Sequence, residues 1–414
     1  MRKHLGIIAR LAALAAVSTL AANAASMAGW TDRKEYDLVL KIRVESSPQK
    51  QLDLLNQWKQ QYPKSDMRQV RRELFLSAYQ ALNDVVHMFE TAQEMIEDQP
   101  ANLVGVYWCT LLTPEMKDAK PETLAIGDKA SHQLLSGLDA YFAPNQKPES
   151  VSDEDWQKQR TAAELLANRT MGYVQWKTGD SAGAEKTFRA YLEKDPKSAE
   201  VMSWLGYVLA AESQPVAAAW QLTRAAASRD DEALPEIWRR QVDDMADRLY
   251  TGYHGDSEGL DKFKTAAAAN AFPPADFQVE SAEAVKQRKA DEELSRLDPE
   301  LAAWMRIFKR LTAVDGEKYF LEELKPNPLP KLRGAVIKCS PALRPNEVVL
   351  GLTSASAEEV TLRVSTPLPH AAEPGTTIEF QGTADTFIKD PFKLTVLVDK
   401  ENITGWPEAG TRRK

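Results

Sequence analysis

The sequence is poor in the residues that build disulfide scaffolds and metal sites. It contains two cysteines and five histidines in 414 residues. A disulfide framework or a structural zinc site needs several such residues at short spacings. Beyond residue 24 the histidines stand far apart, and none has a second histidine three or four positions away: His87, His132, His254 and His370. We therefore expect no metal ion and no other cofactor.

The sequence also lacks the short motifs that mark common catalytic sites. No G-x-S-x-G, P-loop or G-x-G-x-x-G pattern occurs. Runs of carboxylates at 153–155 and 230–232 stand beside expected helix starts, where acidic side chains complement the helix dipole. These absences predict that the protein is not an enzyme. A catalytic site assembled from distant residues, with the 101–160 segment as its source, is the alternative that stays open.

Glycine and long hydrophobic runs are scarce as well. The 19 glycines are few for this length, which argues against an all-β chain. Beyond residue 24 no stretch reaches the roughly 18 apolar residues that a membrane span needs, so none is expected there. The remaining composition, 43% hydrophobic and 27% charged, is that of an ordinary soluble protein, and the length allows two or three domains.

Residues 1–24 have the pattern of a secretory signal peptide. Basic residues at the start are followed by the apolar run 11–20 and by Ala22 and Ala24, which frame an A-x-A cleavage site. We expect the protein to be exported and to be periplasmic or secreted. Because 1–24 hold three basic and no acidic residues, their removal changes the net charge from −8 to −11. That balance disfavours non-specific binding to nucleic acid.

Residues 165–198 and 199–232 repeat one pattern with an offset of 34. The small residue Gly172 corresponds to Gly206. Other corresponding pairs are Met171/Leu205, Tyr173/Tyr207, Ala184/Ala218, Phe188/Leu222 and Tyr191/Ala225. Two antiparallel helices joined by a short turn pack closely only where one presents a small residue at the crossing. The repeat therefore predicts two consecutive helical hairpins.

This pattern resembles the tetratricopeptide repeat (TPR) family. The first unit carries the family's small, apolar and terminal positions in order at Gly172, Ala184, Phe188, Tyr191 and Pro196. The second carries Gly206, Ala218, Leu222 and Ala225, with Asp230 in place of the terminal proline. The resemblance implies an α-solenoid of helical hairpins, whose first helices line a concave groove.

Helical patterns extend the expected TPR-like domain over residues 30–325. Ser152 with Asp155 forms a capping pattern ahead of an unusually long helix. Prolines at 326, 328 and 330 predict a stiff extended linker over 326–331. Divergent helical pairs are expected upstream at 35–64, 68–100 and 101–143.

Residues 332–407 are expected to form a small β domain, because apolar and polar residues alternate there. The pattern predicts a five-stranded barrel or sandwich, and its order loosely resembles an OB-type barrel. Residues 331–414 have a net charge of +1 and their phenylalanines fit a core, so no nucleic-acid partner is expected. The five expected strands lie at 332–339, 347–352, 360–364, 377–381 and 392–398.

The TPR resemblance places six residues on the concave face: Arg169, Tyr173, Trp176, Lys177, Ser203 and Tyr207. Tryptophan, tyrosine and arginine dominate many interfaces, so these residues form the candidate protein-binding site. An equally weighted alternative is that the aromatic rings pack between the repeats. In the TPR subfamily that clamps a C-terminal carboxylate an asparagine stands in place of Tyr173, so this clamp is not expected.

Together these features predict an exported, non-catalytic TPR scaffold or adaptor that binds a protein or peptide in the cell envelope. The alternative function is a cell-wall glycan-binding module that uses the C-terminal β domain, with Phe387 and Trp406 as exposed rings. The sequence leaves open the oligomeric state and whether Cys109 pairs with Cys339.

Overall fold

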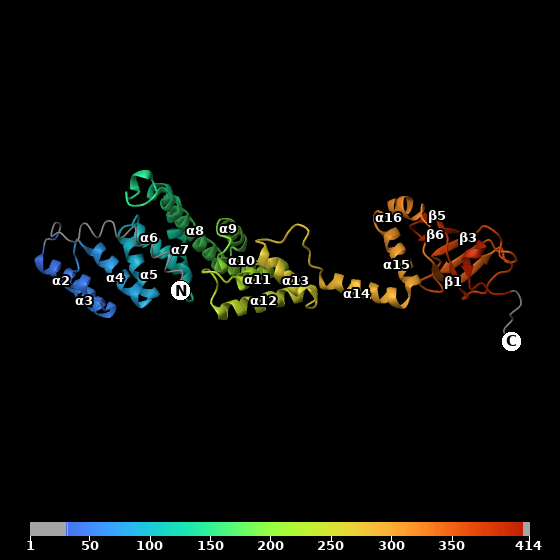
Figure 1. Cartoon of the computed structure of the whole chain (residues 1–414), viewed down its shortest axis with the longest axis horizontal. Coiled ribbons are helices and arrows are strands. Elements are labelled where there is room, and N and C mark those ends of the chain that lie inside the picture. Colours follow the sequence, from blue (N-terminus) through green and yellow to red (C-terminus); the bar gives the residue numbers. More distant parts are fainter. Residues whose placement is uncertain (1–29, 31, 409–414) are drawn as a thin grey trace. The chain divides into compact units, whose positions relative to one another are not determined.

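The computed structural model describes residues 30 and 32–408, so the predicted signal peptide at 1–24 lies outside the described residues. Contacts divide the chain into two compact units, Met1–Ala282 and Glu283–Lys414. The described part of the first unit is helical, and the second unit contains a β-sheet (Figure 1). The prediction of a mainly helical chain with a C-terminal β region is confirmed at this level.

The first unit consists of helices that follow one another along the chain. The α-helices are α2 (Arg33–Val44), α3 (Pro48–Gln61), α4 (Arg68–Leu82), α5 (Val85–Asp98), α6 (Leu103–Leu112), α7 (Pro121–Tyr141), α8 (Asp153–Thr178), α9 (Ser181–Lys194), α10 (Ala199–Ala211), α11 (Pro215–Ala227), α12 (Glu236–His254) and α13 (Leu260–Ala269). Short 3₁₀ turns, η1 (Thr113–Glu115) and η2 (Pro144–Gln146), flank α7.

Local chemistry explains where several of these helices begin. Asp84 and Asp180 accept hydrogen bonds from the backbone N–H groups of the first turns of α5 and α9. The predicted cap of the long helix is present, because the Ser152 side chain accepts a hydrogen bond from the backbone N–H of Asp155 at 3.1 Å. These caps satisfy N–H groups that have no partner inside the helix.

The two repeated hairpins, α8–α9 and α10–α11, share one packing contact. A Cβ placed on Gly172 would lie 2.4 Å from the Phe188 ring, and a Cβ on Gly206 would lie 2.6 Å from Leu222. All four side-chain positions are buried. The residue pairs are related by the 34-residue offset, so the small residue stands at the helix crossing in both hairpins.

The buried core of the first unit also follows the chain. One hydrophobic cluster joins α2, α3 and α4, a second joins α4 to α8, and a third joins α9 to α13. Helices pack mainly against their neighbours in the sequence. Such an arrangement lets each hairpin cover the apolar face of the one before it.

The strands of the second unit and the helical segments from α15 onward share one hydrophobic core. The sheet has the order β5-β6-β3-β2-β1-β4-β7, in which only β3 and β6 pair in parallel. The strands are β1 (Leu332–Ser340), β2 (Glu347–Gly351), β3 (Val360–Val364), β4 (Thr377–Phe380), β5 (Thr383–Ile388), β6 (Lys393–Val398) and β7 (Ile403–Thr404). The other elements are α14 (Ala282–Leu297), α15 (Pro299–Thr312), α16 (Gly316–Tyr319), the π-helical turn η3 (Phe320–Leu324) and the 3₁₀ turn η4 (Lys400–Asn402).

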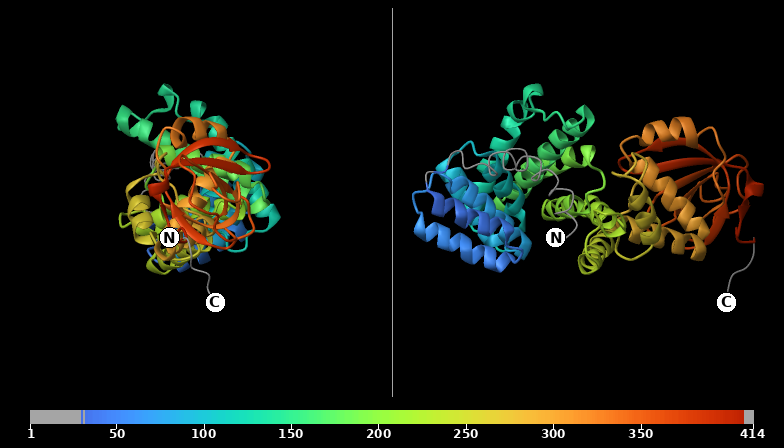
Figure 2. Two further views of the ribbon diagram at one scale, coloured as in Figure 1. Left: turned by 90° about the vertical axis from the view of Figure 1, so that its right-hand side faces the viewer. Right: turned by 60° about the vertical axis from the view of Figure 1, so that its left-hand side comes forward.

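The sheet is curled rather than flat. Strands β4 and β5 lie near opposite ends of the strand order, yet only Gln381 and Gly382 connect them. Two extended residues span at most about 7 Å, so the two ends of the sheet must approach each other. This curvature encloses the core, and α15 and α16 lie alongside the sheet (Figure 2).

The prediction of five strands is wrong, because the described sheet has seven. The pattern missed β5 and β7. Strand β5 is an edge strand in which Ala384 is the buried residue, so its sequence lacks the apolar alternation that marks a half-buried strand. Strand β7 is only two residues long, and such a pair has no periodicity to detect.

The boundary between the units differs from the linker predicted at 326–331. Trp304, Ile307 and Leu311 of α15 are buried in the same core as the sheet. Leu329 is buried too, and its backbone N–H donates to the carbonyl of Gly382 at 2.8 Å. The apolar stripe of α15 therefore covers the sheet, and the proline-containing segment packs against it.

Candidate binding surface

The structure brings the six predicted binding residues together on two neighbouring helices. Four of them lie on α8 and two on α10. They divide into a set with little exposure, called here the buried set, and a set that reaches the surface. The buried set is Tyr173, Ser203 and the largely buried Arg169, and the other set is Trp176, Lys177 and Tyr207. The two sets have different neighbours and therefore different roles.

Arg169 of α8 forms ion pairs with residues of α10 and η1. Its guanidinium donates to Glu200 of α10 at 2.6 Å and to Glu115 of η1 at 2.9 Å, and its side chain is 12% exposed. Burial by itself lowers the pKa of Arg169, but the two carboxylates outweigh it and raise the pKa above its usual value. Arg169 is thus a structural connector whose charge is already neutralised.

Tyr173 and Ser203 are also occupied by internal contacts. The Tyr173 ring is 8% exposed and packs in one cluster with Leu124 of α7. Ser203 is buried, and its hydroxyl donates to the carbonyl of Glu200 at 2.7 Å. These two residues, like Arg169, are therefore engaged in contacts inside the unit.

Trp176, Lys177 and Tyr207 form what we call the α8–α10 aromatic surface. The Trp176 and Tyr207 rings are stacked, with 6.0 Å between centroids and 8° between planes. The Lys177 ammonium lies 3.8 Å from the Trp176 centroid, within range of a cation–π contact. Partial burial lowers the pKa of Lys177. The surface therefore consists of two stacked, half-buried rings with the Lys177 ammonium over the face of Trp176.

Sequence reasoning missed Trp204, which packs against two residues of the buried set. Its ring lies 5.2 Å from that of Tyr173, and the Arg169 guanidinium lies 5.1 Å from its centroid. Trp204 stands within the apolar run 201–205, so by sequence it is an ordinary core residue. Trp204 could have been found from its position next to Ser203, because the TPR resemblance places Ser203 on the concave face.

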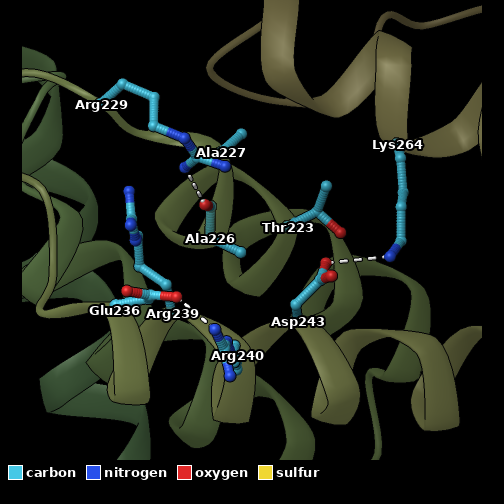
Figure 3. A pocket seen from close by; sticks show the side chains of 9 residues that line it. All are labelled: Thr223, Ala226, Ala227, Arg229, Glu236, Arg239, Arg240, Asp243 and Lys264. Carbon is cyan, nitrogen blue, oxygen red and sulfur yellow. Dashed lines mark hydrogen bonds and ion pairs between the residues drawn. The ribbon is translucent and has the colours of Figure 1, made fainter.

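A separate polar pocket of about 360 Å³ opens between α11, α12 and α13 (Figure 3). Arg240 pairs with Glu236, and Lys264 pairs with Asp243 at 2.9 Å. The Arg229 guanidinium donates to the backbone carbonyl of Ala226. No predicted binding residue lines this pocket, and most of its charges are satisfied by neighbours within it.

Other sequence expectations concern cysteines and membrane spans. Cys109 and Cys339 are free thiols, one in each unit. Burial raises the pKa of Cys109 to about 12, which keeps the thiol protonated. Across residues 30 and 32–408, no helix has both the length and the apolar character that crossing a bilayer requires.

Comparison with known proteins adds no family to this picture. No protein-family model, curated protein or solved structure matches the chain. The fold and the candidate surface therefore rest on the residues and geometry described above.

Proposed function

We propose that this chain is an exported, non-catalytic adaptor of the TPR type that binds a protein or peptide partner in the cell envelope. The contact surface of the proposal is the α8–α10 aromatic surface. The stacked pair Trp176–Tyr207, with the Lys177 ammonium over the Trp176 ring, is the observation that carries it.

The repeat geometry supports the TPR assignment. Gly172 faces Phe188 and Gly206 faces Leu222 at a spacing of 34 residues. The helix boundaries follow the same period, since α9 begins at Ser181 and α11 at Pro215. A period kept in sequence, helix boundaries and close contacts together is typical of a repeat architecture.

The surface is suited to an apolar side chain next to an acidic one. A flat pair of half-buried rings offers apolar area at low entropic cost, because each ring is already held by its neighbour. Lys177 is exposed and pairs with no carboxylate among the salt bridges of the described residues. A partner carboxylate near Lys177 therefore gains a charge contact without displacing an internal one.

Peptide selection tests this proposal. Peptides selected from a random display library on residues 25–414 are measured by fluorescence anisotropy against the unaltered chain and a Trp176→Ala, Lys177→Ala, Tyr207→Ala variant. We expect the variant to lose affinity by about tenfold or more, since such residues each contribute over about 1 kcal/mol at interfaces. Selected peptides should carry an apolar residue beside Asp or Glu.

The control is Trp238→Ala, because Trp238 is a tryptophan of α12 that is 55% exposed and lies outside the proposed surface. This variant should bind the selected peptides as the unaltered chain does. Circular dichroism establishes that both variants are folded. Equal affinity of the triple variant and the unaltered chain would contradict the proposed surface.

The glycan-binding alternative depends on exposed rings in the second unit. Phe387 lies 5.8 Å from Phe320 and 5.7 Å from Phe392, and Trp406 also packs against the core. The rings of the α8–α10 aromatic surface are half-buried and packed against a core in the same way. They have in addition an exposed cation, Lys177, against one of the rings.

A further inference from the structure

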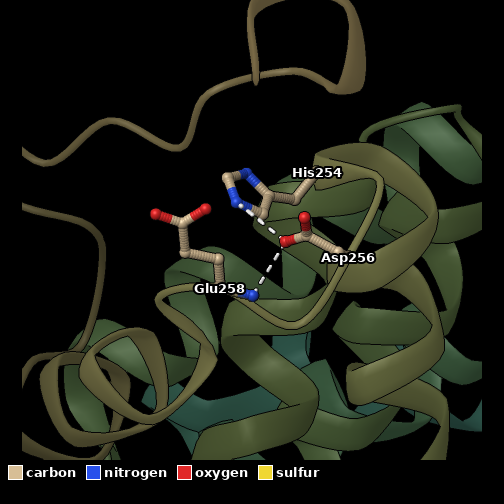
Figure 4. A group of neighbouring side chains, drawn as sticks. All are labelled: His254, Asp256 and Glu258. Atoms are coloured by element: carbon tan, nitrogen blue, oxygen red, sulfur yellow. Dashed lines mark hydrogen bonds and ion pairs between the residues drawn. The ribbon is translucent and has the colours of Figure 1, made fainter. Parts of the chain in front are cut away.

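Three potential metal ligands meet where α12 ends. We propose that His254, Asp256 and Glu258 form a binding site for a divalent transition-metal ion such as Zn²⁺. One ligand atom from each side chain lies within 4.8 Å of the other two (Figure 4). Two observations, the state of the histidine ring and the local course of the chain, support this assignment.

The His254 ring presents a buried nitrogen toward the two carboxylates. Its side chain is 6% exposed, and Nδ1 lies 2.9 Å from the carbonyl oxygen of Glu280. Because a carbonyl only accepts, Nδ1 carries the proton, and the lone pair of the neutral ring is on Nε2. Nε2 lies 3.5 Å from an Asp256 oxygen and makes no hydrogen bond.

This arrangement is the one that metal-binding histidines use. A ligating imidazole commonly donates its other N–H to a carbonyl or carboxylate, which fixes both the tautomer and the ring orientation. A buried polar nitrogen without a hydrogen bond costs free energy. A metal ion on Nε2 would satisfy it.

The Asp256 carboxylate is held by the chain that follows it. The backbone N–H of Glu258 donates to Asp256 at 2.9 Å, which orients that carboxylate beside the ring. Gly255 has φ +96°, a left-handed conformation that lets the chain turn at the end of α12 and bring residues 256 and 258 back toward His254. The carbonyl end of a helix carries partial negative charge, so the position favours a cation.

The donor set indicates the class of metal. One imidazole nitrogen with two carboxylate oxygens suits borderline ions such as Zn²⁺, whereas Ca²⁺ and Mg²⁺ prefer oxygen ligands alone. Three protein ligands leave at least one position for water or another group.

The sequence predicts no metal site because it contains no pair of histidines three or four residues apart. The candidate site instead uses one histidine with acids two and four positions later, across a helix end. The recognisable signal was the segment His254–Glu258, in which the glycine that ends the helix separates the histidine from the first acid.

Metal titration tests the site on the chain from residue 25 to residue 414. After EDTA treatment, calorimetry with Zn²⁺ should give one site per chain, and Co²⁺ should give a visible absorption spectrum. His254→Gln and the nearly isosteric Asp256→Asn should each weaken zinc binding by about tenfold or more. His132→Gln is the control, because His132 is exposed and lies on α7.

Three results would overturn the proposal: no zinc binding at micromolar concentrations, equal affinity in folded Asp256→Asn, or a His254 ring protonated at neutral pH in ¹⁵N NMR. The last result would mean that His254 forms an ion pair with Asp256 instead. If His254→Gln fails to fold, Asp256→Asn and the NMR measurement still decide the question.

Discussion

Gly172 and Gly206 illustrate how single residues set the distance between helices. Each stands where its helix crosses the next one, with an apolar side chain of the partner helix directly above its Cα. Glycine elsewhere in a helix is a cost of about 0.5–1 kcal/mol relative to alanine. At these crossings the absence of a Cβ is what permits close packing.

Replacing Gly172 by alanine should destabilise the protein. The added Cβ would lie 2.4 Å from the buried Phe188 ring, so the helices must separate or the ring must leave its position. We expect a loss of about 1–3 kcal/mol in the free energy of unfolding, measured by urea denaturation.

Gly252→Ala is the matched control for this prediction. Gly252 is an exposed residue of α12, and nothing lies within 4 Å of the position of its Cβ. There alanine should stabilise by about 0.5–1 kcal/mol through helix propensity alone. Similar effects of the two substitutions would mean that the crossing does not constrain residue 172.

Among the elements, several turns that follow a helix share one backbone feature. A residue in the left-handed region follows α4, α8, α10 and α12, namely Asn83, Gly179, Ser213 and Gly255. Gly179 and Ser213 are related by the 34-residue offset. The same turn is therefore made once by glycine and once by a residue with a side chain, for which this conformation is unfavourable.

Exchanging the residue types at these two turns should have opposite effects. Ser213→Gly should stabilise by about 1 kcal/mol, because φ +60° no longer brings a Cβ close to the backbone. Gly179→Ala should destabilise by about the same amount, although nothing lies within 4 Å of its Cβ position. Thermal denaturation of each variant gives its change in melting temperature relative to the unaltered chain. Changes of the same sign in the two variants would contradict this account of the turns.

For the whole molecule, the position of α15 decides where a foldable fragment begins. Trp304 and Leu311 are 0% exposed within the core of the second unit. A cut at the proline-containing segment would remove them and leave the facing sheet residues in water. A cut at residue 283 keeps them.

Two fragments test this boundary. Residues 283–414 should fold alone, with dispersed amide signals in a ¹H–¹⁵N spectrum and a cooperative thermal transition. Residues 326–414 should lack that cooperativity or aggregate, because the sheet loses its covering helices and exposes a large apolar patch. If the shorter fragment is as stable as the longer one, α15 does not belong to the folding unit of the sheet.

The sequence by itself determined the helices of the first unit and the presence of a β region. Apolar spacing, the Ser152 cap and the 34-residue period depend on residues close together in the chain, and the structure has helices at those places. Strand β5 escaped detection because it pairs at a sheet edge and has little buried surface of its own.

Only the tertiary structure decided how residues far apart in the sequence are used. The sequence grouped Arg169 with Trp176, but the contacts of Arg169 with Glu115 and Glu200 make it a buried connector, while Trp176 reaches the surface. The sequence likewise assigned α15 to the repeats, whereas the apolar side chains of α15 are buried in the core that it shares with the sheet. Local patterns specify which face of an element is apolar, but the partner that covers this face is set by the whole fold.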